Sequence, residues 1–126
     1  MKHQWRQQEK KLYIPKAIPE IVQVPKFKFF VIHGEGNPNG QKFAEHIGVL
    51  YALSFAIKMN LKKENPFTNY QDYTVYPLEG VWDINDEAKK TYNGVLDKDT
   101  LVYDLMIRQP DFLSTEYVER IIKQTK

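Results

Sequence analysis

The sequence lacks cysteine, long apolar runs and a large excess of charge of either sign. The absence of cysteine excludes a disulfide framework and thiolate chemistry. No run of about 18 apolar residues is present, so we expect no membrane span, and no basic-then-apolar leader is recognisable. The 18 basic and 16 acidic residues give a formal net charge of +2, and such a balanced chain without a basic stripe argues against nucleic-acid binding. These absences predict a cytoplasmic domain.

What the chain has instead is apolar and aromatic content. Of its 126 residues, 42% are hydrophobic and 13% are aromatic, which suits one domain with a real core and argues against disorder. The three histidines, His3, His33 and His46, show no metal-ligand spacing, and no serine has a recognisable nucleophile context. We therefore expect no metal and no cofactor, and the sequence identifies no catalytic residue.

The strongest structural signal is the segment 101–112, in which two unlike sets of side chains alternate. This period of two predicts a strand. Pro110 has no amide hydrogen to donate, so pairing should end near Gln109. Segment 73–82 is a second strand candidate that should pair antiparallel with the first. One alternating set is Leu101, Tyr103, Leu105 and Ile107, and the other is Val102, Asp104, Met106 and Arg108.

A further strand and a long helix are predicted upstream. The strand covers 20–33, with Phe27, Phe29 and Val31 on the face that we assign to the core. The helix covers 41–61, with Asn37 as N-cap, Pro38 at its first position and Asn65-Pro66 at its end. Its apolar stripe contains Phe43, Ile47, Leu50, Ser54 and Ile57, and Ala44, Tyr51, Phe55 and Met59 widen it.

The remaining segments complete an α+β pattern. Residues 1–19 are predicted to be an N-terminal arm, solvated or briefly helical, that Trp5 can anchor, and residues 20–126 form one domain. A helical turn is expected from Asp86 to Tyr92 within the long connection 83–100. A last helix, capped by Ser114 or Thr115, carries an apolar stripe with no obvious partner: Tyr117, Val118, Ile121 and Ile122.

The order strand, helix, strand, strand, helix then defines the fold. We expect a three-stranded antiparallel sheet with the long helix on one face and a C-terminal helix.

One carboxylate, Glu79, lies in an aromatic neighbourhood. A carboxylate on a largely apolar strand is costly to bury unless it is paired or protonated. It either recognises a cationic or hydrogen-bonding ligand stacked on aromatic rings, or it is solvated beside a glycine bend. Glu79 and Trp82 are three residues apart, so a regular strand places them on opposite faces unless Gly80 marks a bulge. Arg108 is expected to form a local ion pair with Asp111.

Two motifs carry a resemblance to a known family. Pro77-Leu78-Glu79-Gly80-Val81-Trp82, followed by Leu105-Met106-Ile107-Arg108-Gln109-Pro110-Asp111-Phe112, resembles the gyrase-inhibitor-like (GyrI-like) small-molecule-binding family, in its uncharacterised bacterial branch. The N-terminal pieces Trp5-Arg6-Gln7-Gln8-Glu9-Lys10 and Tyr13-Ile14-Pro15 fit the same branch. Members usually contain two copies of a strand-helix-strand-strand module, and this chain resembles the first copy only.

The resemblance implies a ligand cleft between two modules that binds small hydrophobic or cationic aromatic molecules. A second copy of this chain would then supply the missing module, giving a homodimer. Two alternatives remain open: a hydrolase acting on strained-ring, cyclopropane-bearing genotoxic compounds, or a protein-interaction module of gyrase-inhibitor type. The residues expected to line the cleft are Glu79, Trp82, Tyr76, Tyr73 and Tyr103.

Overall fold

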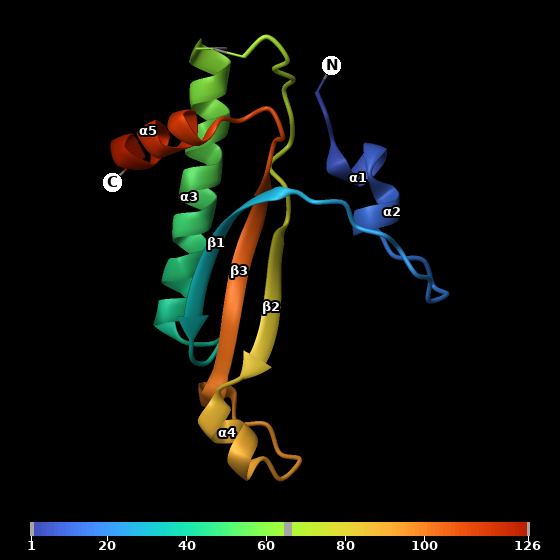
Figure 1. The fold of residues 1–126 in the computed structure, drawn as a ribbon, viewed down its shortest axis with the longest axis vertical. Helices are drawn as coiled ribbons and strands as arrows, with labels where there is room; N and C mark the ends of the chain where they lie inside the picture. Colours follow the sequence, from blue (N-terminus) through green and yellow to red (C-terminus); the bar gives the residue numbers. More distant parts are fainter. Residues whose placement is uncertain (1, 65–66, 126) are drawn as a thin grey trace.

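Three antiparallel strands form the sheet, and the last strand of the sequence lies in its middle (Figure 1). In this computed structural model, which describes residues 2–64 and 67–125, the strands are β1 (Lys28–Glu35), β2 (Leu78–Ile84) and β3 (Leu101–Gln109). The strand order is β1-β3-β2, and both neighbours pair antiparallel with β3. The predicted fold class is confirmed.

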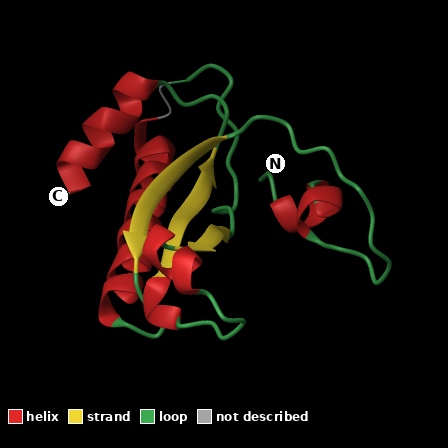
Figure 2. Cartoon of the chain, turned by 60° about the horizontal axis from the view of Figure 1, so that its bottom comes forward, coloured by secondary structure: helices red, strands yellow, loops and turns green. Residues whose placement is uncertain are grey.

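Helix α3 (Gln41–Glu64) covers one face of this sheet (Figures 1 and 2). Its apolar stripe packs on the alternating residues Tyr103, Leu105 and Ile107 of β3, which are fully buried. The predicted stripe is confirmed for its central members, whereas Phe55 and Met59 are exposed and do not widen it. The core members on α3 are Leu50, Ile57 and Leu61, with Phe43, Ile47 and Tyr51 packed against them.

The core face of β1 was predicted wrongly. Phe30 and Ile32 pack against the core, whereas Val31 is 53% exposed. The register with β3 explains this, because Phe30 lies opposite Ile107 and Ile32 opposite Leu105, and directly opposite residues share one face of a sheet.

Both upstream strands are shorter than predicted. Lys28 already pairs with Gln109, the last residue of β3, so residues 20–27 have no strand to pair with. The predicted strand over 73–82 begins only at Leu78, directly after Pro77, and Tyr73 makes a single bridge to His3.

The helix boundaries also differ in part from prediction. The side chain of Asn37 accepts a hydrogen bond from the amide of Asn39 at 2.9 Å, so it closes a turn, and α3 begins at Gln41. The predicted end of the helix at Asn65-Pro66 lies outside the described residues.

Two short helices form in the connection from β2 to β3. Helix α4 (Asp86–Thr91) confirms the predicted helical turn, and the side chain of Asn85 caps it by accepting from the amide of Ala88. The 3₁₀ turn η1 (Lys98–Thr100) comes after α4 and immediately precedes β3. Figure 1 shows α4 beyond the end of the sheet.

The last helix, α5 (Thr115–Thr125), has its partner within the chain. Ser114 caps it through its hydroxyl, which accepts from the amide of Tyr117 at 3.2 Å. Tyr117 and Ile121 are buried in the core cluster, and α5 lies across α3 (Figure 1). The expectation that this stripe lacks a partner was therefore wrong for Tyr117 and Ile121.

The N-terminal arm folds into α1 (Trp5–Gln8) and α2 (Lys10–Tyr13), on the side of the sheet edge formed by β2 (Figures 1 and 2). The indole N–H of Trp5 donates to the carbonyl oxygen of Val75 at 2.9 Å, which confirms Trp5 as an anchor. Segment 14–27 then runs to β1 as an exposed loop (Figure 2). Within the described ranges, no helix is long and apolar enough to span a membrane.

Candidate functional site

The sheet face that points away from α3, called here the open face, carries the candidate site. Glu79, Met106 and Val31 lie side by side in one row across β2, β3 and β1. The next row contains Val81, Asp104 and His33. The open face therefore combines apolar side chains with a few charged groups.

Glu79 is the carboxylate of this face that burial affects most. The residue as a whole is solvent-exposed. Burial raises the pKa of Glu79 above its ordinary value, and the positive charge of Arg108 offsets only part of this rise. A carboxylate in such surroundings holds its proton more tightly than a fully solvated one.

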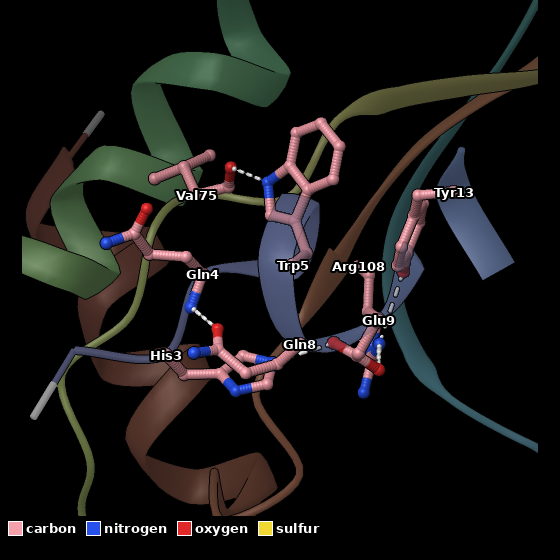
Figure 3. A network of polar contacts seen from close by, with 8 residues as sticks. All are labelled: His3, Gln4, Trp5, Gln8, Glu9, Tyr13, Val75 and Arg108. Atoms are coloured by element: carbon pink, nitrogen blue, oxygen red, sulfur yellow. Dashed lines mark hydrogen bonds and ion pairs between the residues drawn. The ribbon is translucent and has the colours of Figure 1, made fainter. Parts of the chain in front are cut away.

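Arg108 lies diagonally across from Glu79 on β3, and the N-terminal arm holds its side chain. The guanidinium lies against two rings, with its central carbon 3.5 Å from the ring centroid of Phe27 and 4.4 Å from that of Tyr76. Its Nη1 donates to Glu9 Oε1 at 2.8 Å and to the hydroxyl of Tyr13 at 3.2 Å (Figure 3). The predicted pair with Asp111 was wrong, because Glu9 takes this place.

The polar network extends from Glu9 to His3. Glu9 Oε2 lies 2.7 Å from His3 Nε2. Burial alone would raise the pKa of Glu9, but the hydrogen bonds from Arg108 and His3 prevail and lower it. Burial raises the pKa of Tyr13, and Arg108 counteracts only part of that rise. At neutral pH, the network therefore holds an ionised Glu9 against an ionised Arg108.

A cavity of about 210 Å³ lies beside this network. Arg108 and Glu9 meet at its wall with the rings of Tyr76, Tyr73 and Phe112. Burial raises the pKa of Tyr76 to about 12, so its hydroxyl stays protonated and neutral. The cavity thus offers aromatic surface beside one buried cation.

The five residues predicted to line a ligand cleft fall into two groups. Tyr76 and Glu79 both lie near Arg108, and Tyr73 lies behind Tyr76, with their rings stacked at 6.3 Å. Trp82 and Tyr103 lie on the other face of the sheet, toward α3. Each residue of β2 pairs with one residue of β3, so Gly80 marks no bulge and Glu79 and Trp82 face opposite ways.

The second group is an aromatic cluster at the start of α3. Trp82 lies 5.2 Å from Tyr103 and 5.5 Å from Phe43, measured between ring centroids, and it remains 41% exposed. The hydroxyl of Tyr103 lies 3.0 Å from His46 Nδ1. Tyr103 itself is buried, so Trp82 presents more ring surface to solvent than Tyr103 does.

Within residues 2–64 and 67–125, no group of three or more histidine, aspartate or glutamate side chains is arranged to hold a metal ion. His33 pairs instead with Asp104, with 2.8 Å between Nδ1 and Oδ1.

Comparison with known proteins finds similarity to solved structures. No model of a known protein family matches the sequence, and no curated protein matches it. An uncharacterised conserved protein from Listeria innocua is similar with a TM-score of 0.84 and 32% identity, over 98% of this chain and 58% of its own. Two Listeria innocua structures named as hydrolases have TM-scores of 0.80 and 0.81 and identities of 31% and 34%.

The matched proteins are considerably longer than this chain. The two hydrolase structures are matched over 98% of this chain but only 59% and 58% of their own length. The chain therefore spans less than two thirds of each of these three structures.

Proposed function

We propose that this chain is one module of a GyrI-like domain and binds small hydrophobic or cationic aromatic molecules on the open face at Glu79. The observation that carries the proposal is the position of Glu79, a solvent-exposed carboxylate with a raised pKa, in a row with Met106 and Val31. A carboxylate beside apolar surface attracts an organic cation and selects it over a neutral compound. The matching GyrI-like motifs described above support the same interpretation.

The test is replacement of Glu79 by glutamine, which removes the charge and keeps the shape. We expect the variant to bind rhodamine 6G, a hydrophobic dye cation, about 10- to 100-fold more weakly, because a hydrogen bond to a charged group contributes roughly 1.5–3 kcal/mol. Fluorescence polarisation measures both affinities. Glu119→Gln, an exposed carboxylate on α5, is the matched control and should leave the affinity unchanged. Equal affinities for the wild type and Glu79→Gln would remove Glu79 from the site.

The pH dependence of dye binding gives a second readout. The cation needs ionised Glu79, and the pKa of this carboxyl is raised. Binding should therefore decline on acidification at a higher pH than an ordinary glutamate would cause. In Glu79→Gln this decline should disappear.

A hydrolase is the second candidate, and the names of two similar structures favour it. Hydrolytic opening of a cyclopropane breaks one C–C bond of the ring and bonds the oxygen of water to one of these carbons. The electron pair of the broken bond goes to the attached ring system, which takes up a proton released from the water. Glu79 is the group that would direct the water molecule. Mass spectrometry of a cyclopropane-bearing electrophile incubated with the chain tests this activity. An unchanged compound in the presence of the chain, with dye binding intact, would favour the binding function alone.

We also propose that two copies of the chain associate. β1 and β2 are the edge strands of the described sheet, and an open edge invites further pairing. An apolar hollow of about 250 Å³ between α3 and α5, lined by Val49, Leu53 and Ile122, offers further surface. Light scattering at micromolar concentration should give the mass of a dimer. The interface between the two copies should bury at least about 1,000 Å² of surface in total. A monomeric mass would contradict this proposal.

A further inference from the structure

Arg108 is a buried cation whose orientation is fixed before any ligand arrives. Its side chain is only 6% exposed, and the rings of Phe27 and Tyr76 lie against the guanidinium at 3.5 and 4.4 Å. A planar guanidinium offers its donors as a rigid fork that matches a carboxylate, and rings that fix its plane reduce the entropy lost on binding. The surroundings of Arg108 therefore resemble a prepared anion site.

The protein uses only part of this fork. Nη1 donates to Glu9 and Tyr13, whereas the buried Nε has no hydrogen-bond partner within residues 2–64 and 67–125. A buried donor of a charged group is costly to leave unsatisfied, and such groups are rare. The cavity of about 210 Å³ that Arg108 lines adds aromatic walls from Tyr73, Tyr76 and Phe112. A ligand with a hydrogen-bond acceptor would satisfy the unpaired Nε, and an apolar body on the same ligand would pack against the aromatic walls of the cavity.

The present partner of Arg108 is itself a carboxylate, and it is carried by the N-terminal arm. Glu9 lies between α1 and α2, which segment 14–27 joins to β1 as an exposed loop without regular structure. In this loop Ile21 is fully exposed. Glu9 therefore already pairs with Nη1 of the guanidinium, and its carboxylate competes with that of a ligand for the positive charge of Arg108.

We propose that Arg108 and the adjoining cavity bind small aromatic monocarboxylates, and that Glu9 is an intramolecular competitor for this site. The inference goes beyond the dye-cation site, because Glu79 does not line the cavity. The cavity is smaller than the roughly 300–1,000 Å³ of drug-sized sites, so a single-ring acid fits its size. Asp111 on the wall disfavours a second negative charge, which favours a monocarboxylate over a dicarboxylate.

The experiment uses benzoate as the probe and Trp5 as the reporter. The chain has two tryptophans, so Trp82→Phe leaves Trp5, on the arm, as the sole indole. We expect benzoate to change the fluorescence of Trp5 saturably in this background. Glu9→Gln should tighten benzoate binding about tenfold or more, because truncating one member of a close charge pair has effects of this order. Arg108→Met should abolish binding.

Three controls separate the competitor from weaker explanations. Benzamide, the neutral isostere, should bind much more weakly than benzoate. Asp104→Asn removes a negative charge from the same sheet face, but Asp104 pairs with His33 and not with Arg108, so its effect should stay within about twofold. Far-ultraviolet circular dichroism checks that each variant is folded. If Arg108→Met is unfolded, the comparison of Glu9→Gln with Asp104→Asn decides alone.

Defined outcomes would overturn the proposal. The absence of a saturable benzoate signal in both the parent and Glu9→Gln would show that Arg108 has a structural role only. Equal affinity for benzamide and benzoate would reduce the site to an apolar cavity. If Glu9→Gln and Asp104→Asn tightened benzoate binding equally, the cause would be the loss of one negative charge anywhere near the site, and not competition by Glu9. Because rhodamine 6G binding is measured separately, failure here leaves the proposed function at Glu79 standing, and the reverse also holds.

Discussion

The two faces of β3 are held in different ways. Toward α3, Tyr103, Leu105 and Ile107 are buried in one continuous apolar cluster. On the open face, Asp104 and Arg108 have partners that lie far away in the sequence, His33 and Glu9. The first face depends on many packing contacts that no single group can replace. The second depends on a few polar contacts that a ligand or partner can take over, which is why we place function there.

The largest expected effect contrasts two neighbouring residues of β3. Ile107→Ala should lower the free energy of unfolding by about 2–5 kcal/mol, because Ile107 is completely buried and the truncation leaves a cavity. Met106→Ala on the open face should cost less than half as much, since Met106 is only partly buried. Urea midpoints at constant m-value measure both losses. Equal losses would mean that the open face is as tightly covered as the other one.

A smaller effect is expected where β1 passes beneath Tyr103. A Cβ added at Gly34 would lie 2.6 Å from three atoms of the Tyr103 side chain, which is buried and hydrogen-bonded to His46. Gly34→Ala should therefore cost about 1–3 kcal/mol through overpacking. Thermal unfolding of the variant gives the loss.

The matched control is the same substitution in an open position. Gly48 lies inside α3 with no atom within 4 Å of an added Cβ. Gly48→Ala should gain about 0.5–1 kcal/mol, because glycine loses more conformational freedom than alanine in a helix. A neutral Gly34→Ala would show that the α3 face has room to adjust.

The elements with a clear hydrophobic period in the sequence, β3 and α3, were predicted correctly. The bounds of β1 and β2 and the core face of β1, which depend on strand pairing, were not. The alternation of β3 and the stripe of α3 are local patterns, so the antiparallel sheet with one covered face followed from them. In the segment around β1, both alternating sets of side chains contain apolar residues, since Phe29 and Phe30 are adjacent. Only the register with β3, in which Phe30 meets Ile107, decides which phase is buried.

The candidate site shows the same division between local and distant information. Alternation places Glu79 and Trp82 on opposite faces unless Gly80 forms a bulge, and only the continuous pairing of β2 with β3 excludes the bulge. The partner of Arg108 was missed because Glu9 lies 99 residues away in the sequence, and a charge pattern suggests only nearby partners such as Asp111. The one available signal was Trp5, whose expected anchoring brings the arm, and with it Glu9, onto the domain.

The smallest expected effect is a difference in pH dependence between Glu9 and Glu79. Relative to the ordinary value of 4.5, the pKa of Glu9 is lowered and that of Glu79 is raised. Ionised Glu9 therefore stabilises the fold above pH 4.5, and this contribution is lost as the pH falls through its lowered pKa. Ionised Glu79 is a penalty at neutral pH that is relieved as the pH falls through its raised pKa toward 4.5.

Urea unfolding between about pH 3 and pH 7 resolves these two contributions as differences from the wild type. Glu9→Gln should be less stable than the wild type at neutral pH, with the difference shrinking below pH 4.5. Glu79→Gln should be slightly more stable at neutral pH, with the difference vanishing as the pH approaches 4.5. Each difference should be about 1 kcal/mol or less, because both carboxylates are partly solvated. Differences of the same sign would mean that the arm and the sheet do not impose opposite electrostatic conditions on these carboxylates. Glu9 could then no longer be distinguished, as the carboxylate paired with Arg108, from Glu79 as the carboxylate available to a ligand.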